Sequence, residues 1–265
     1  MIDLRDIFKQ ASATLEGETA IVFRALEGVR DFDFEVNGDR VFPAASIIKL
    51  SILWAVMRRI EEGEAAFTDV LRVEDGDMFG TLEAQHHPIA STELTVRDLC
   101  MLMVDLSDNL ASNMLVRCAG LDFINEEIRR CGLGQTVLRR KFLDYETRAK
   151  GVDNYTTPLE TVRMITLFTD RAASGSALAA DMLGILALQC DKNYLSQYMP
   201  DTFKFAHKTG HVPGALHNVG IVTTPAGGRY VVSVMTNRLQ SDVEGLRFLN
   251  TFGERMFAFM REHEL

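Results

Sequence analysis

A run of twelve residues at positions 46–57, SIIKLSILWAVM, is apolar on every helical face and yet contains a lysine, Lys49. The pattern predicts a helix that is buried on all sides. A lysine in such surroundings needs a partner or loses its charge, because desolvation disfavours the ammonium. Ser46 lies three residues earlier on the same face, where a partly neutral amine can take the proton of its hydroxyl. The alternative is structural: Ser46 caps the helix and Lys49 extends its amine to the surface.

The composition is that of a globular protein. The chain has 265 residues, 47% of them apolar, with 37 acidic and 28 basic side chains and a formal charge of −9. This length fits one or two domains. The acidic balance argues against nucleic acid and anionic membranes as partners. No apolar stretch reaches the roughly 20 residues that a membrane-spanning helix needs.

The N-terminal sequence and the cysteines bear on the compartment. MIDLRDIFKQASATLEGE lacks the basic start, apolar core and small-residue cleavage site of a signal peptide. The cysteines show no C-x-x-C spacing, which favours free thiols over a disulfide or a metal cluster; they are Cys100, Cys118, Cys131 and Cys190. We therefore expect a cytoplasmic protein, with export as the alternative if a leader has been trimmed.

The order of the expected elements predicts the fold class. Residues 3–15 have the pattern of an amphipathic helix, and residues 19–36 that of a β-hairpin. A mostly helical stretch follows, then three strands between residues 202 and 237, and a closing helix from about residue 242. We expect an α+β fold in which N- and C-terminal helices flank one antiparallel sheet. The predicted sheet subdomain comprises residues 1–45 and 191–265, and an inserted all-helical subdomain comprises residues 46–190.

Two further motifs follow Ser46 and Lys49 in order. SDN stands at positions 107–109, and KTG stands at positions 208–210, at the end of a predicted strand. The set S-x-x-K, S-D-N and K-T-G is a signature of class A β-lactamases and penicillin-binding proteins. The chain thus resembles the class A β-lactamase-like serine hydrolases. The motifs that carry the resemblance span about two thirds of the chain, and the resemblance implies the same α+β fold.

The resemblance implies a role for each matching residue. Ser46 would be the acylated nucleophile and Lys49 its proton partner, while Ser107 would relay a proton to the departing nitrogen. The substrate-binding residues would be Asn109 for a side-chain amide, Lys208 and Thr209 for a carboxylate, and Gly210 and His211 at the strand end. The backbone N–H groups of Ser46 and His211 would form the oxyanion hole. Relatives usually carry a small residue where this chain has His211, so we expect a narrower mouth here.

The long polar segment GLGQTVLRRKFLDYETRAKGVDNYTTP, residues 132–158, departs from the family. Relatives that hydrolyse their acyl-enzyme efficiently place a glutamate in this loop to orient the attacking water. Aligned through TVLRR, that position falls close to Phe142; aligned through LDYE, it falls on Glu146. Asp144 and Glu146 are both candidates for the base. The alternative is that both are solvated loop carboxylates.

Metal and cofactor sites are not expected. The histidines do not indicate a metal, because His207 and His211 flank a strand end and do not converge on one ion; the others considered are His86, His87 and His217. CGLGQT contains a G-x-G without a strand before it or a helix after it, so it is no nucleotide fingerprint.

Three functions are consistent with these motifs. The first is a β-lactamase that opens β-lactam amides through an acyl-enzyme on Ser46. The second is a penicillin-binding, D-alanyl-D-alanine peptidase-like or sensor protein that is acylated in the same way but deacylates slowly. Both take a small β-lactam or acyl-D-Ala-D-Ala-like substrate. The third is a scaffold that only binds a partner, and it is disfavoured because every acylation residue is present.

Overall fold

The computed structural model describes residues 3–26, 32–79 and 92–263, and its centre is a five-stranded sheet with the order β2-β1-β9-β8-β7. Every neighbouring pair of strands in it is antiparallel. The strands are β1 (Glu18–Ala25), β2 (Phe34–Val36), β7 (Lys204–Val212), β8 (Ala215–Thr223) and β9 (Arg229–Asn237). The expected hairpin of β1 and β2 and the three C-terminal strands are therefore present.

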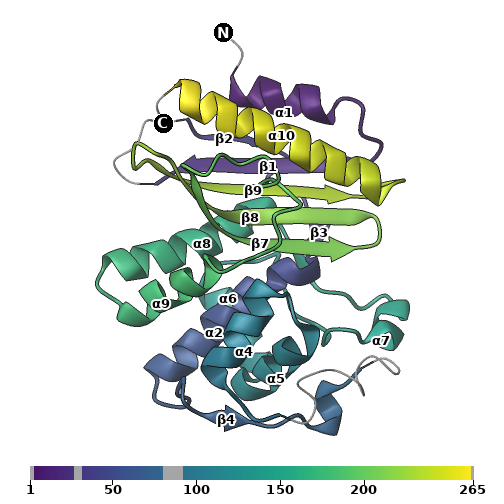
Figure 1. Ribbon diagram of the computed structural model, residues 1–265. Helices are drawn as coiled ribbons and strands as arrows, with labels where there is room; N and C mark the ends of the chain where they lie inside the picture. The colour runs from purple at the N-terminus through teal and green to yellow at the C-terminus, as the bar shows by residue number, and fades with distance from the viewer. Residues whose placement is uncertain (1–2, 27–31, 80–91, 264–265) are drawn as a thin grey trace.

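Two terminal helices cover one face of the sheet (Figure 1). They are α1 (Leu4–Ser12) and α10 (Asp242–Glu262). Their apolar side chains and those of the facing strands form one core, in which Phe8 packs edge-on against Phe252 at 5.4 Å between ring centroids. The amphipathic pattern at the start of the chain thus produces a helix that packs against the last one.

The described helices of the middle of the chain are α2 (Lys49–Glu61), α4 (Val96–Asp105), α5 (Asn109–Ala119), α6 (Leu121–Arg130), α7 (Tyr145–Ala149), α8 (Pro158–Ala173) and α9 (Ala177–Leu186). Among them, α8 packs against the opposite face of the sheet, and most of the others lie below the sheet in the view of Figure 1. A second apolar core joins α2 to strands β8 and β9 without a break. Thr161 of α8 also lies 2.9 Å, oxygen to oxygen, from Ser233 of β9. The α+β fold class is confirmed, and α2 reaches the sheet through shared apolar packing.

Short elements connect the helical part. They are β3 (Phe42–Pro43), which pairs with β6 (Tyr155–Thr156), β4 (Val70–Leu71), which pairs with β5 (Leu94–Thr95), and the 3₁₀ turns η1 (Ala45–Ile48) and η2 (Asp75–Asp77). The expected helix over residues 46–57 begins as η1 and continues as α2 from Lys49. In a 3₁₀ turn, side chains three residues apart eclipse each other, so Ser46 and Lys49 still share a face.

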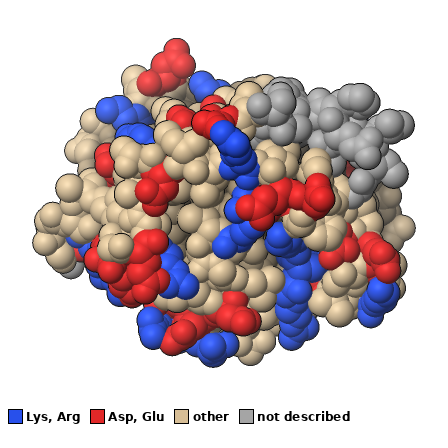
Figure 2. Space-filling model, turned by 90° about the horizontal axis from the view of Figure 1, so that it is seen from below, with Lys and Arg blue, Asp and Glu red and all other residues tan. Residues whose placement is uncertain are grey.

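The surface of the helical part carries charges of both signs. Figure 2 shows Lys and Arg side chains next to Asp and Glu side chains across the face seen from below. Arg58, for example, pairs with Glu62, and Arg130 pairs with Glu126. Among the described residues, no helix has the length and apolar character needed to cross a membrane.

Candidate active site

Ser46 lies in the turn η1, which the protein holds from several sides. Ala44, just before the turn, donates its N–H to the carbonyl of Asn154 at 2.8 Å. One residue further back, Pro43 accepts a hydrogen bond from Nε2 of the buried His217 at 2.8 Å. Ala45 has a φ of 46°, in the left-handed region that residues with a Cβ rarely adopt. Such strain persists only where surrounding contacts fix the backbone, as they do here.

Lys49 follows one turn later and is 0% exposed. Its Nζ donates to the Ser107 carbonyl at 2.6 Å, to the Ser107 Oγ at 3.2 Å and to the Asn109 Oδ1 at 3.0 Å. Burial and the nearby charge of Lys208 lower the pKa of Lys49 well below its ordinary value, although Asp108 opposes the shift. The amine therefore does not extend to the surface, and it is readily neutralised.

Ser107 lies between α4 and α5, and Asn109 is the first residue of α5. Ser107 has a φ of 54°, so a second residue of this site is in the left-handed region. Asp108 caps α5 by accepting the N–H of Ala111 at 2.7 Å, which fixes the start of the helix. Because the Asn109 Oδ1 accepts from Lys49, the amide nitrogen of Asn109 is left to donate elsewhere.

Strand β7 brings the third motif next to η1. Gly210 packs closely against this turn: a Cβ atom at Gly210 would lie 3.0 Å from the Cγ1 of Ile47 and 3.3 Å from the Cβ of Ala45. Lys208 is 0% exposed, and burial lowers its pKa to about 7 against the opposing effect of Asp191. The Thr209 hydroxyl lies 3.4 Å from a carboxylate oxygen of Asp191.

A cavity of about 100 Å³ opens beside Ser46. His211 lies on its wall, and its Nε2 is 3.0 Å from Asp242 at the start of α10. Narrowing of the mouth by His211 stays a prediction. Around the cavity are Ala45, Ser46, Asn109, Arg140, Phe142, Leu143, Tyr145, Arg148, Asn154, His211 and Val212. Lys208, Thr209 and Ser107 are outside this set, and Ser107 lines a neighbouring cavity of about 270 Å³.

The long loop supplies the other wall of the cavity. Arg140 and Asp153 form a largely buried ion pair across its base, with a shortest separation of 2.6 Å. Asn113 of α5 accepts the N–H of Phe142 at 2.8 Å and donates to its carbonyl at 3.1 Å. Held in this way, the Phe142 ring lies 4.6 Å from the Lys49 Nζ, measured to the ring centroid. The loop residue beside the buried amine is therefore aromatic.

The two candidate loop carboxylates lie away from the cavity wall. Asp144 caps α7 by accepting the N–H of Thr147 at 3.0 Å. Burial acts to raise the pKa of Asp144, but its hydrogen bonds with Thr147 and the nearby charges of Arg140 and Lys150 lower this pKa overall. The side chain of Glu146 is 84% exposed and pairs with Lys150 at 2.9 Å. Neither is among the residues around the cavity beside Ser46.

The histidines do not converge. His207 and His217 are both buried, and burial lowers their pKa values to about 3 and about 4. His86 and His87 lie outside the described residues. Within residues 3–26, 32–79 and 92–263, no group of three or more possible metal ligands comes together. All four cysteines are free thiols.

Sequence reasoning missed several residues of this site. Asn113 and Asn154 had no motif around them. Asn113 contacts Phe142, 29 residues away in the chain, and Asn154 contacts Arg140, 14 residues away. Asp191 also went unnoticed, although it lies beside Thr209. One signal was available for the loop. Arg140 pairs with Asp153 and closes the loop, and this pair places Phe142 near the position that the TVLRR alignment gives for the family's glutamate.

The sheet, its flanking helices and the inserted helices together make a class A-like serine β-lactamase fold. The model of the Beta-lactamase enzyme family matches residues 3–260, and the chain belongs to this family. A β-lactamase of Streptomyces albus G is 27% identical over 219 residues, which are 78% of this chain and 68% of that protein.

Two solved structures extend the likeness. A β-lactamase from Sphaerobacter thermophilus superposes with a TM-score of 0.83 at 28% identity, covering 99% of this chain and 97% of that one. A leucine-to-glutamate mutant of PBP-A, an acyl-enzyme complex with penicillin G, superposes with a TM-score of 0.83 at 26% identity, covering 98% and 96%.

Proposed function

We propose that the chain is a serine enzyme whose Ser46 is acylated by β-lactams and which releases the acyl group slowly. One observation supports the first half above all: a fully buried Lys49, hydrogen-bonded to Ser107 and Asn109, one 3₁₀ turn after Ser46. An amine whose pKa is lowered by burial is a competent base for a serine hydroxyl.

The proposed reaction begins when the Ser46 Oγ attacks the lactam carbonyl and passes its proton to the Lys49 Nζ. The backbone N–H groups of Ser46 and His211 would stabilise the oxyanion. When the C–N bond breaks, the proton moves from Nζ to the leaving nitrogen through the Ser107 Oγ, which lies 3.2 Å from Nζ. Asn109 would bind the substrate amide, and Lys208 with Thr209 would bind the carboxylate.

The second half of the proposal rests on the loop. Hydrolysis of the ester needs a base for the attacking water, a contribution of typically two to four orders of magnitude. Phe142 stands beside Lys49 and cannot accept a proton. Asp144 and Glu146 are engaged with Thr147 and Lys150 instead. We therefore expect the acyl-enzyme to accumulate, as in a penicillin-binding or sensor protein.

Rapid hydrolysis, as in an efficient β-lactamase, is the second candidate. The family match and the likeness to the Streptomyces albus G and Sphaerobacter thermophilus β-lactamases favour it. The two candidates share the acylation step and differ only in how fast water removes the acyl group from Ser46.

Intact mass and stopped-flow kinetics test both halves. After brief exposure to benzylpenicillin, the protein should gain the mass of one ligand, and a chromogenic cephalosporin should give a burst of one equivalent followed by a slow steady state. Ser46→Ala should show neither, whereas Ser51→Ala, a matched change in the helix α2 that follows, should behave like the wild type. An adduct on Ser46→Ala would disprove the nucleophile; turnover without a burst would favour the rapid β-lactamase.

A further inference from the structure

A third cavity, of about 410 Å³, lies between α9 and the edge strand β7. Its volume is within the range of about 300–1,000 Å³ that is usual for small-molecule sites. It shares no residue with the cavity beside Ser46. Leu183, Ala206 and Ile221 give it an apolar floor.

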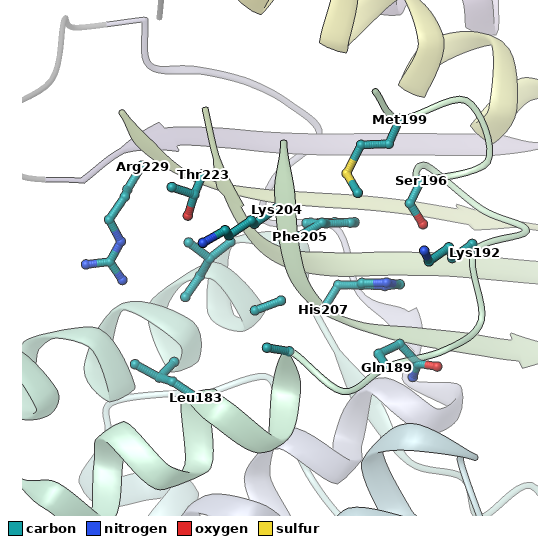
Figure 3. Close-up of a pocket in the computed structure, with 13 residues that line it drawn as sticks. Leu183, Gln189, Lys192, Ser196, Met199, Lys204, Phe205, His207, Thr223 and Arg229 are labelled. Carbon is teal, nitrogen blue, oxygen red and sulfur yellow. The ribbon is translucent and has the colours of Figure 1, made fainter. Parts of the chain in front are cut away.

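One end of this cavity is cationic. Lys204, Thr223 and Arg229 are cross-strand neighbours on β7, β8 and β9, and Figure 3 shows them together at one end. Both basic side chains are exposed, and neither belongs to an ion pair among the described residues. No acidic side chain is among the residues that line the cavity, although the whole protein carries a formal charge of −9.

The opposite end offers hydrogen-bond donors. Figure 3 shows Ser196 and Lys192 there, beside the ring of His207. Ser196 is 4% exposed, and its hydroxyl has no hydrogen-bond partner in the described part of the chain. Leaving a buried hydroxyl unpartnered costs free energy, which a ligand atom would recover. Lys192 is exposed and adds a positive charge.

His207 is a second donor at this end. Its Nδ1 lies 3.0 Å from the amide nitrogen of Asn218, which donates to it. Burial, with the charges of Lys208 and Lys192, lowers the pKa of His207 to about 3, so the ring is neutral at ordinary pH. Its one proton is therefore on Nε2, and Nε2 has no protein partner within the described ranges.

We propose that this cavity binds an elongated amphipathic carboxylate that carries a hydrogen-bond acceptor at its far end. The carboxylate would lie between Lys204 and Arg229, where a guanidinium binds two oxygens at once. The apolar body would cover Leu183 and Ala206, and the far acceptor would reach Ser196 and His207. Lys204 and His207 are three residues apart on β7, about 10 Å along the strand, and their side chains leave opposite faces of it, so the ligand would pass over the edge of β7. The inference does not depend on Ser46.

Calorimetric titration of the full chain with three probes of equal length tests the site. The probes are decanedioate, decanoate and decanol, used below their micelle concentrations at one ionic strength. We expect one equivalent of decanoate to bind at least about tenfold more tightly than decanol, and decanedioate more tightly still. Equal affinity of decanol and decanoate, or several equivalents of each, would mean apolar adsorption and overturn the proposal.

Variants at the two ends locate the ligand. Replacing both Lys204 and Arg229 with Ala should weaken decanoate binding by about tenfold or more, whereas Lys9→Ala, an exposed cation on α1, should leave it unchanged. Ser196→Ala should remove the advantage of decanedioate over decanoate without weakening decanoate. Unchanged decanoate binding in the double variant would disprove the site. Acylation of Ser46 by benzylpenicillin should persist in all of these variants, and this separates the outcome from that of the proposed function.

Discussion

The helices and strand β7 bring two buried lysines and serine and threonine hydroxyls to the region of Ser46, whereas the loop 139–154 brings two aromatic side chains, a leucine, an asparagine and two arginines. On the first side, burial lowers the pKa values of Lys49 and Lys208. On the second, Phe142 lies beside Lys49, and Arg140 and Arg148 both pair with Asp153. Groups with strongly shifted pKa values are typical of reactive centres, so we propose proton transfer as the role of the first side and packing as the role of the second.

The two sides also differ in what fixes them. Lys49 and Ser107 are held by packed helices, and both Ala45 and Ser107 keep left-handed backbones there. The loop is fixed by polar contacts: those of Asn113 with Phe142, the Arg140–Asp153 ion pair, and the hydrogen bonds of Asn154 with the backbone of Arg140. We therefore expect a change in the loop to alter the fate of the proposed acyl group while leaving acylation intact, and substitutions on each side can test this separation.

The largest effect is expected for Lys49→Arg. A guanidinium does not deprotonate in proteins, so it cannot take the proton of Ser46. We expect the acylation rate constant at saturating benzylpenicillin to fall by about two to four orders of magnitude or more. Lys208→Arg is the matched control, and it should mainly raise the substrate concentration that half-saturates acylation. Equal loss of the saturated rate in both variants would remove the distinction between the two lysines.

Phe142→Glu should convert the loop from packing to catalysis. The new carboxylate would lie beside Lys49 and could accept a proton from the attacking water. We expect deacylation, measured as loss of the adduct by mass spectrometry, to accelerate by about two orders of magnitude, near the lower limit for an added general base. The carboxylate would also raise the pKa of Lys49 and so shift the acid limb of acylation upwards in pH. Phe142→Leu, which keeps an apolar side chain, should deacylate like the wild type; acceleration in that variant would point to loosening of the loop.

The sequence predicted the helical side of the site much better than the loop side. The spacing of Ser46 and Lys49, and the order of the motifs, follow from local helix and strand patterns, and the structure brings Lys49, Ser107 and Asn109 together. The sequence did not predict that Lys49 donates hydrogen bonds to Ser107 and Asn109, because those contacts join residues that are 58 and 60 positions apart in the chain. Nor did the sequence decide between Phe142 and Glu146 for the position of the family's glutamate, because the loop has no period and the placement of Phe142 depends on contacts with Asn113.

The pH dependence of acylation distinguishes Lys208 from Lys49, and the expected effect is a change of about tenfold in the second-order acylation constant per pH unit. Burial lowers the pKa of Lys208 to about 7, so the free enzyme loses this cation as the pH rises above that value. A neutral amine no longer attracts the substrate carboxylate, so the second-order acylation constant should fall on the alkaline side by about tenfold per pH unit. Lys208→Arg should remove this limb, because its cation persists. An alkaline limb that survives in Lys208→Arg would assign the titration to another group.

The smallest effect is expected from the loop carboxylates. Asp144 accepts the N–H of Thr147, and an asparagine caps a helix about as well as an aspartate, so Asp144→Asn should keep α7 in place. Glu146 is largely exposed, and its pair with Lys150 is a surface contact. We therefore expect Asp144→Asn and Glu146→Gln to change the burst and the steady state by no more than about twofold, within the usual scatter of surface substitutions. Stopped-flow measurement of both phases with one penicillin and one cephalosporin provides the comparison. A steady state that slows by tenfold or more in one variant, with its burst intact, would identify that carboxylate as the base and would mean that the loop moves when the acyl-enzyme forms.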